Sequence, residues 1–139
     1  MKVELKRIND AVHLEGSTER GNTVSIDGSP AIGGQDLGAR PMELLLAALG
    51  SCSSMDVLSI LAKQKQPVQG FAVEVDGKRK DGAVPAVFTD IHVHFKLTGE
   101  LDAGKVERAI ELSLGTYCSV SKMIDTTAKI TSSFSINES

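Results

Sequence analysis

Large aromatic residues are scarce in this sequence, which has no tryptophan, one tyrosine and four phenylalanines among 139 residues. The hydrophobic core must therefore be aliphatic, built from leucine, isoleucine, valine and alanine. Apolar residues make up 41% and charged residues 24% of the chain, as in ordinary soluble proteins. A chain of this length is expected to form a single domain with a substantial core.

An excess of positive charge is also absent, because 15 lysines and arginines face 18 acidic residues, for a formal net charge of −3. Nucleic-acid binding needs a basic surface and gains from stacking aromatic side chains, so we expect no nucleic-acid partner. The longest nearly apolar run, 44–49, is too short to cross a bilayer, and residues 1–7 do not resemble a signal peptide. We expect no membrane association and a cytoplasmic location.

Cysteine is limited to Cys52 and Cys118. In a reducing compartment two cysteines are more often free, catalytic or metal-bound than joined in a permanent disulfide. Their spacing is not a CxxC pattern and gives only a weak metal signal. His92 and His94 would share one face of a strand, but no third ligand is evident and a polar surface is the favoured interpretation. We therefore expect neither a metal nor a bound cofactor.

The pattern of apolar and turn residues predicts three parts in one α+β domain. Residues 1–40 are expected to form a meander of two or three strands followed by a glycine-containing loop. A helix over about 41–65 would begin at Pro41, which suits the first helical position. Residues 69–137 are expected to form a β-β-α-β arrangement. Its elements are strands at 71–77 and 87–97, a helix from the cap Asp102 to Gly115, one or two helical turns at 118–124, and a strand at 128–136.

The 87–97 strand is expected to have one apolar face, formed by Val87, Thr89, Ile91, Val93, Phe95 and Leu97. The central helix is apolar or small on nearly every face over 44–52, which is typical of a helix buried on all sides. One small sheet could not cover it, so two such helices are expected to pack together in a dimer.

Each cysteine has a functional interpretation and a structural alternative. Cys118 is expected near the start of a short helix, where unpaired N–H groups would lower the pKa of its thiol. Cys52 lies in mid-helix and would need a cation to be reactive, with Arg20 or Arg40 as candidates. Asp56, one turn further on, would oppose a thiolate at Cys52 if both faced the same way. A small buried core residue is the alternative for each cysteine.

Two motifs resemble those of the OsmC/Ohr family, named for osmotically inducible and organic hydroperoxide resistance proteins. The run PMELLLAALGSC at 41–52 resembles the family's central-helix motif, and YCSVS at 117–121 resembles its second cysteine motif. The resemblance covers nearly the whole chain and is greatest to the branch often called YhfA-like.

The resemblance implies an intertwined homodimer in which two long central helices lie between mixed sheets, with active sites at the subunit interface. It also implies a thiol peroxidase in oxidative-stress defence. Cys52 would attack an organic hydroperoxide, Cys118 would form a disulfide with the resulting sulfenic acid, and an external dithiol, lipoyl-type in the family, would restore the thiols. Arg20, or alternatively Arg40, would hold the thiolate, and Glu43 would orient the arginine.

The sequence departs from the peroxidase pattern at one position. Met42 follows the proline where the peroxidase branches have glutamate, and Glu43 comes one residue later. One residue turns a helical side chain by about 100°. A non-peroxidatic redox sensor, a dimer that binds an apolar small molecule, and a purely structural dimer are the alternatives.

Overall fold

The structure is a computed structural model that describes residues 1–138. The chain divides into two compact units, Met1–Leu45 and a second unit that begins at Leu46. The long helix α1 (Pro41–Lys63) begins in the first unit and continues into the second. The α+β class is confirmed, with two three-stranded sheets and three α-helices in the described chain.

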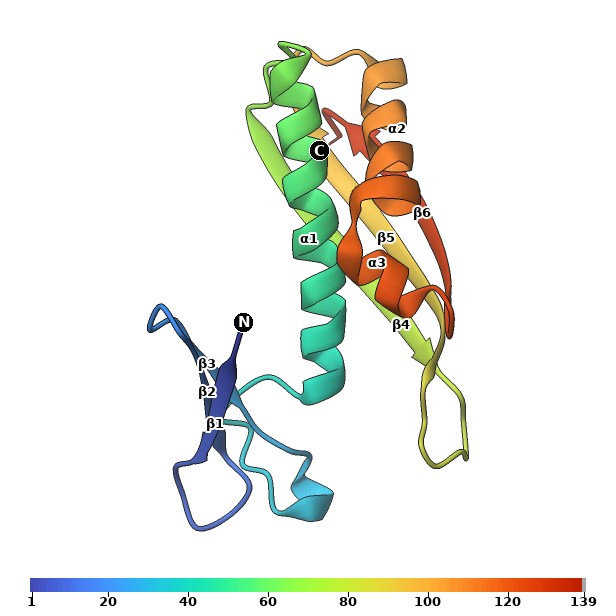
Figure 1. The fold of residues 1–139 in the computed structure, drawn as a ribbon. Coiled ribbons are helices and arrows are strands. Elements are labelled where there is room, and N and C mark those ends of the chain that lie inside the picture. The colour runs from blue at the N-terminus through green and yellow to red at the C-terminus, as the bar shows by residue number, and fades with distance from the viewer. Residues whose placement is uncertain (139) are drawn as a thin grey trace. The chain divides into compact units, whose positions relative to one another are not determined.

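The first unit is an antiparallel meander of β1 (Val3–Arg7), β2 (Leu14–Thr18) and β3 (Thr23–Ile26), as predicted (Figure 1). The predicted loop follows and includes one short 3₁₀ turn, Pro30–Ile32. Buried Asp27 organises this loop, because its carboxylate accepts backbone N–H groups of Gln35, Leu37 and Gly28. These hydrogen bonds, above all that from Gln35, hold the pKa of Asp27 below its ordinary value.

The second unit contains a mixed sheet in the order β4-β5-β6. β4 (Gly70–Arg79) pairs antiparallel with β5 (Phe88–Thr98), and β6 (Lys129–Ile136) pairs parallel with β5. The parallel pair is connected by α2 (Ala103–Leu112), the π-helical turn η2 (Ser113–Tyr117) and α3 (Ser119–Ile124). These helices and the second-unit part of α1 lie on the same side of the sheet (Figure 1).

The core of this unit lies between the sheet and the helices and is aliphatic apart from phenylalanine in β5. Gly50 lets α1 approach β4, because a Cβ atom there would come within 2.8 Å of Val75 Cγ2. The buried core residues of β5 are Phe88, Ile91, Val93, Phe95 and Leu97, and those of the helices are Leu49, Val57, Leu61, Val106, Ala109 and Ile110.

Two details of the predicted elements were wrong. The register of β4 and β5 shifts at Lys78 and Arg79, so that Thr89 is passed over and Phe88 is buried while Thr89 and Val87 are exposed. A β-bulge of this kind interrupts the alternation from which the apolar face was predicted. Gly115 does not end the second helix either, because α2 ends at Leu112 and Gly115 lies inside the π-helical turn.

One side of α1 is exposed and carries no charge. Its exposed positions recur at intervals of four and three residues, which places them within about 80° of one another around the helix. This uncharged stripe consists of Ala47, Ser51, Met55, Leu58 and Ala62. By length and composition α1 could also span a membrane, a test that core helices of soluble proteins pass as well.

Candidate functional site: a two-cysteine cluster

The fold brings the two cysteines together. Cys52 lies in mid-α1, and Cys118 is the residue that precedes α3 and caps it. Both are free thiols, and their sulfur atoms lie within 4.8 Å of each other. Their exposure differs, because Cys52 is half-buried whereas only 3% of Cys118 is exposed. The local sequence alone could not show this proximity, which depends on how α2 and the π-helical turn return the chain to α1.

The expected low pKa of Cys118 is wrong. Burial raises the pKa of its thiol to about 11, and the nearby Cys52 thiol adds to this rise. The backbone N–H groups of Ser121 and Val120 act in the opposite direction, and the N–H of Ser121 donates to Cys118 Sγ over 3.3 Å. The predicted helix start is therefore present. The N–H groups of the six-residue helix α3 lower the pKa of Cys118 by less than the loss of water around its sulfur raises it. Cys118 is a protonated thiol at neutral pH.

Asp56 faces the same way as Cys52, as the sequence allowed. A carboxylate oxygen of Asp56 lies within 4.8 Å of both sulfur atoms. Ser113 Oγ lies 3.0 Å from Asp56 Oδ2 and 3.1 Å from the carbonyl oxygen of Ser53, so its single proton is shared between two acceptors. Ser113 is completely buried and was not predicted to take part in the site, since only the π-helical turn after α2 brings it to α1.

A surface groove of about 590 Å³ borders this cluster at Asp56. It runs along the C-terminal half of α1 and the end of α2, with Asp56 in its wall and the exposed ring of Tyr117 at its side. The groove meets the cluster at Asp56, and neither cysteine is among its lining residues. Its lining residues are Asp56, Ser59, Ile60, Lys63, Gln64, Leu112 and Tyr117.

The residues predicted to activate the thiol belong to the first unit. Arg20 is exposed in the turn between β2 and β3, and Arg40 is exposed just before α1. Glu43 lies in the first turn of α1, where its Oε1 atom accepts the backbone N–H of Arg40 over 2.8 Å. This is one half of a capping box, so the carboxylate of Glu43 has a local structural role at the helix start. The activating roles of Arg20, Arg40 and Glu43 stay predictions.

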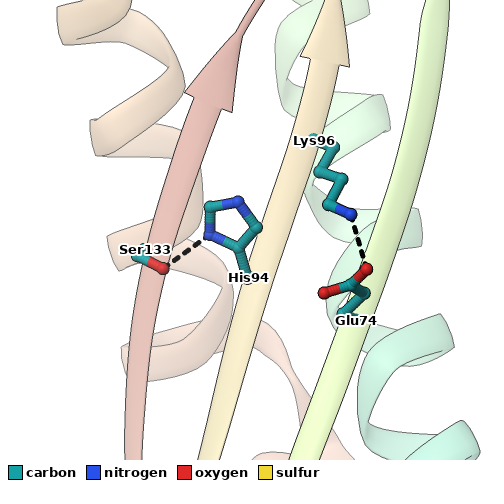
Figure 2. Close-up of polar contacts among 4 residues, drawn as sticks. All are labelled: Glu74, His94, Lys96 and Ser133. Carbon is teal, nitrogen blue, oxygen red and sulfur yellow. Dashed lines mark hydrogen bonds and ion pairs between the residues drawn. The ribbon is translucent and has the colours of Figure 1, made fainter. Parts of the chain in front are cut away.

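The two histidines of β5 lie on the polar face of the sheet, as expected. His94 Nδ1 lies 2.6 Å from Ser133 Oγ, and Lys96 on the same strand forms an ion pair with Glu74 of β4 (Figure 2). His92 contacts Ser133 Oγ and Thr131 Oγ1 of β6, each over 2.7 Å. Hydroxyl groups therefore contact both ring nitrogens of His92 and the Nδ1 atom of His94, which supports the interpretation of a polar surface.

Comparisons with known proteins agree with this fold. The model of the family described as OsmC-like protein matches residues 33–133. Protein YhfA of Escherichia coli strain K12 is 36% identical over 137 residues, which are 98% of each chain. A solved structure of a hypothetical protein from Aquifex aeolicus is 31% identical, with a TM-score of 0.81 and 99% and 97% of the two chains covered.

More distant structures share the fold as well. An organic hydroperoxide resistance protein OsmC from Legionella pneumophila, also described as a predicted redox protein, is 17% identical, with a TM-score of 0.71 and 97% of each chain covered. At this identity the likeness shows the fold alone. The family match and the similarity to YhfA together show that this chain belongs to the OsmC-like protein family.

Proposed function

We propose that this protein is a thiol peroxidase that reduces organic hydroperoxides. The sulfur of Cys52 attacks the distal oxygen of the hydroperoxide, an S–O bond forms, the O–O bond breaks, and the alcohol leaves with the proton. The thiol of Cys118 then attacks the sulfenic acid of Cys52, which forms the disulfide and releases water. An external dithiol exchanges with this disulfide and is itself oxidised.

The observation that carries this proposal is the pairing of two unlike thiols within 4.8 Å. Cys52 is the more accessible of the two residues, and its neighbour in the cluster, Asp56, lines a groove, so we assign to Cys52 the reaction with the peroxide. Cys118 is buried and protonated, which protects it from direct oxidation because the thiolate is the reactive form. A disulfide needs the sulfur atoms to approach to about 2.05 Å, a short movement from their present separation.

The family relationship supports the class of substrate. The Legionella pneumophila protein that shares this fold is described by its resistance to organic hydroperoxides. An apolar or lipid hydroperoxide also suits a groove whose wall includes Ile60, Leu112 and Tyr117. Resetting by a dithiol fits a reducing compartment, and a cytoplasmic location is part of the proposal.

The second part of the proposal is that Arg20 supplies the positive charge that stabilises the Cys52 thiolate, with Glu43 as its orienting partner. Replacement of Arg20 by methionine should then slow turnover at least tenfold, whereas the same replacement of Arg40 should have little effect. The opposite ranking would assign the role to Arg40. Equal rates in both variants and the wild type would show that neither arginine activates the Cys52 thiol.

We further infer that the protein is a homodimer that packs α1 against α1. The uncharged stripe of α1 supports this assembly, because small and apolar side chains on one helix face permit close helix packing. Met55 in this stripe is 68% exposed in the single chain, and packing against a partner helix would remove this apolar side chain from water.

Turnover measurements test the catalytic proposal. Wild-type protein with dihydrolipoamide or dithiothreitol should consume cumene hydroperoxide, and Cys52→Ser should lose at least a hundredfold in rate. Cys118→Ser should turn over more slowly than the wild type, because the sulfenic acid must then wait for the external thiol. Ser132→Ala changes an exposed serine of β6, outside the groove, and serves as the matched control. Equal rates in the wild type and Cys52→Ser would refute the proposal.

A redox sensor is the second candidate, and the position of Asp56 favours it. A carboxylate so close to both sulfur atoms adds negative charge where a fast peroxidase needs positive charge. A sensor would form the Cys52–Cys118 disulfide once per peroxide pulse and show no appreciable turnover with excess dithiol. Sustained turnover would exclude it.

A further inference from the structure

Three potential metal ligands converge at the cysteine cluster. Cys52 and Asp56 are four residues apart in α1 and so share one helix face, and Cys118 reaches them from the start of α3. Their two sulfur atoms and one carboxylate oxygen all lie within 4.8 Å of one another. In a tetrahedral site with metal–sulfur bonds of about 2.3 Å, neighbouring sulfurs are about 3.8 Å apart. Small rotations of the side chains would close the remaining difference.

The donor set selects a class of metal. Thiolate ligands favour Zn²⁺ and similar soft or borderline cations over Mg²⁺ or Ca²⁺, which prefer oxygen ligands alone. Two thiolates and one carboxylate carry a charge of −3 between them, which a divalent cation would largely neutralise. The ion pairs within residues 1–138 join Lys2 to Glu4, Lys96 to Glu74 and Arg108 to Glu111, so Asp56 takes part in none of them.

The surroundings already support the ligands. Ser113 Oγ, within 3.0 Å of Asp56 Oδ2, holds the carboxylate while its other oxygen remains available. The backbone N–H of Ser121 points at Cys118 Sγ. Outer hydrogen bonds of this kind orient ligands and strengthen metal binding. The groove beside Asp56 offers a path for the ion and room for a water molecule as a fourth ligand.

We propose that the reduced protein binds one Zn²⁺-like divalent cation through Cys52 Sγ, Cys118 Sγ and a carboxylate oxygen of Asp56. Each thiol releases its proton to the solvent as its sulfur bonds to the metal, and no electron is transferred. The bound ion occupies both thiols, so that they neither react with peroxide nor form a disulfide. This proposal stands independently of the peroxidase proposal, since it needs only the reduced cluster.

Cobalt titration tests the site directly, because Co²⁺ reports thiolate ligands and tetrahedral geometry in its absorption spectrum. Reduced, metal-free protein should bind one Co²⁺ per chain, with a thiolate charge-transfer band that Zn²⁺ then displaces. Cys52→Ser and Cys118→Ser should each lose at least half of that band. Asp56→Asn should bind Co²⁺ at least tenfold more weakly, while the matched control Asp76→Asn, on the exposed face of β4, should bind like the wild type.

Thiol modification provides a second measurement on the wild type. A stoichiometric amount of Zn²⁺ should slow the reaction of Cys52 with a disulfide reagent at least tenfold, and protein oxidised to the disulfide should bind no Co²⁺. Circular dichroism checks that each variant is folded. Absence of a thiolate band in the wild type, or equal Co²⁺ affinity in Asp56→Asn and the wild type, would overturn the proposal. No peroxide is present in these titrations, so a failure of peroxidase turnover does not affect their outcome.

Discussion

At the scale of single residues, the two thiols of the site differ in burial and are therefore assigned different chemical roles. Cys118 loses almost all contact with water, and that loss governs its chemistry more than its place at the start of α3 does. Cys52 keeps partial access to solvent from the middle of a helix. The sequence motifs identify both cysteines. Their different burial assigns which one reacts with the peroxide and which one then forms the disulfide.

The raised pKa of Cys118 makes a testable prediction about pH. A rise from 9.0 to about 11 leaves about a hundredfold less thiolate at neutral pH than an unperturbed cysteine would have. Cys52→Ser keeps the burial of Cys118, the largest cause of the raised pKa, and removes the smaller contribution of the Cys52 thiol. Alkylation of Cys118 by iodoacetamide in this variant should be slower at pH 8 than in the unfolded chain and should accelerate as the pH rises to 10. Mass spectrometry after timed quenching measures this rate.

The unfolded chain is the control for this prediction, because its Cys118 has an ordinary environment and should be alkylated rapidly already at pH 8. The same shift has a consequence for stability. The folded state holds the thiol proton more tightly, so the contribution of Cys118 to stability is complete below about pH 9 and is lost as the pH rises toward 11. A rate at pH 8 that matches the unfolded chain would contradict the environment described for Cys118.

Much of the site could be predicted at the residue scale, and its limits have physical causes. The two cysteines stand out in the sequence because each lies in a recognisable motif. The proximity of Ser113 could not be predicted, because a π-helical turn sets it and no local pattern marks that turn. The direction of the Cys118 pKa was predicted wrongly, because the sequence indicated the helix start but not the depth of burial.

At the scale of elements, local capping signals were the most reliable guides. Pro41 begins α1 and Asp102 caps α2, both as predicted. The β-bulge at Thr89 was not predicted, because it depends on the register between β5 and β4 and not on the local sequence. The period of apolar residues predicts where strands lie, whereas cross-strand register decides which side chains finally reach the core.

The cap of α2 allows a quantitative test. Asp102 Oδ1 accepts the backbone N–H of Lys105 over 3.0 Å. Asp102→Ala removes this acceptor and should lower the free energy of unfolding by about 1 kcal/mol, whereas Asp102→Ser keeps a side-chain oxygen and should cost little. Urea unfolding measures both variants. Equal losses for alanine and serine would show that the hydrogen bond does not contribute to stability.

At the scale of the whole molecule, α1 carries residues of the cysteine cluster and also the stripe proposed to pack in the homodimer. Gly50 of this helix lies against β4 and Cys52 and Asp56 are half-buried at the cluster, while the uncharged stripe is exposed. The prediction of a single domain stays a prediction, because the described chain consists of two compact units. The sequence indicates that no single small sheet can cover this helix. It does not indicate which surface packs against the uncovered side.

The homodimer proposal predicts the behaviour of the stripe. Met55→Glu places a charge in it and should shift the sedimentation of the protein toward the monomer at low micromolar concentration. Met123→Glu changes a methionine of α3 that is even more exposed than Met55 and lies outside the stripe, and this variant should sediment like the wild type. A wild-type protein that is already monomeric, or a Met55→Glu variant that remains fully dimeric, would contradict packing of α1 against α1.

The most direct test of the central claim is the product formed when the reduced protein meets one equivalent of cumene hydroperoxide. We predict a loss of two hydrogen atoms per chain and a single disulfide-linked pair of peptides that contains Cys52 and Cys118. In Cys118→Ser, a sulfenic acid that dimedone traps at Cys52 should appear instead. Oxidation confined to other residues, or a sulfenic acid at Cys118 with Cys52 unmodified, would contradict the account.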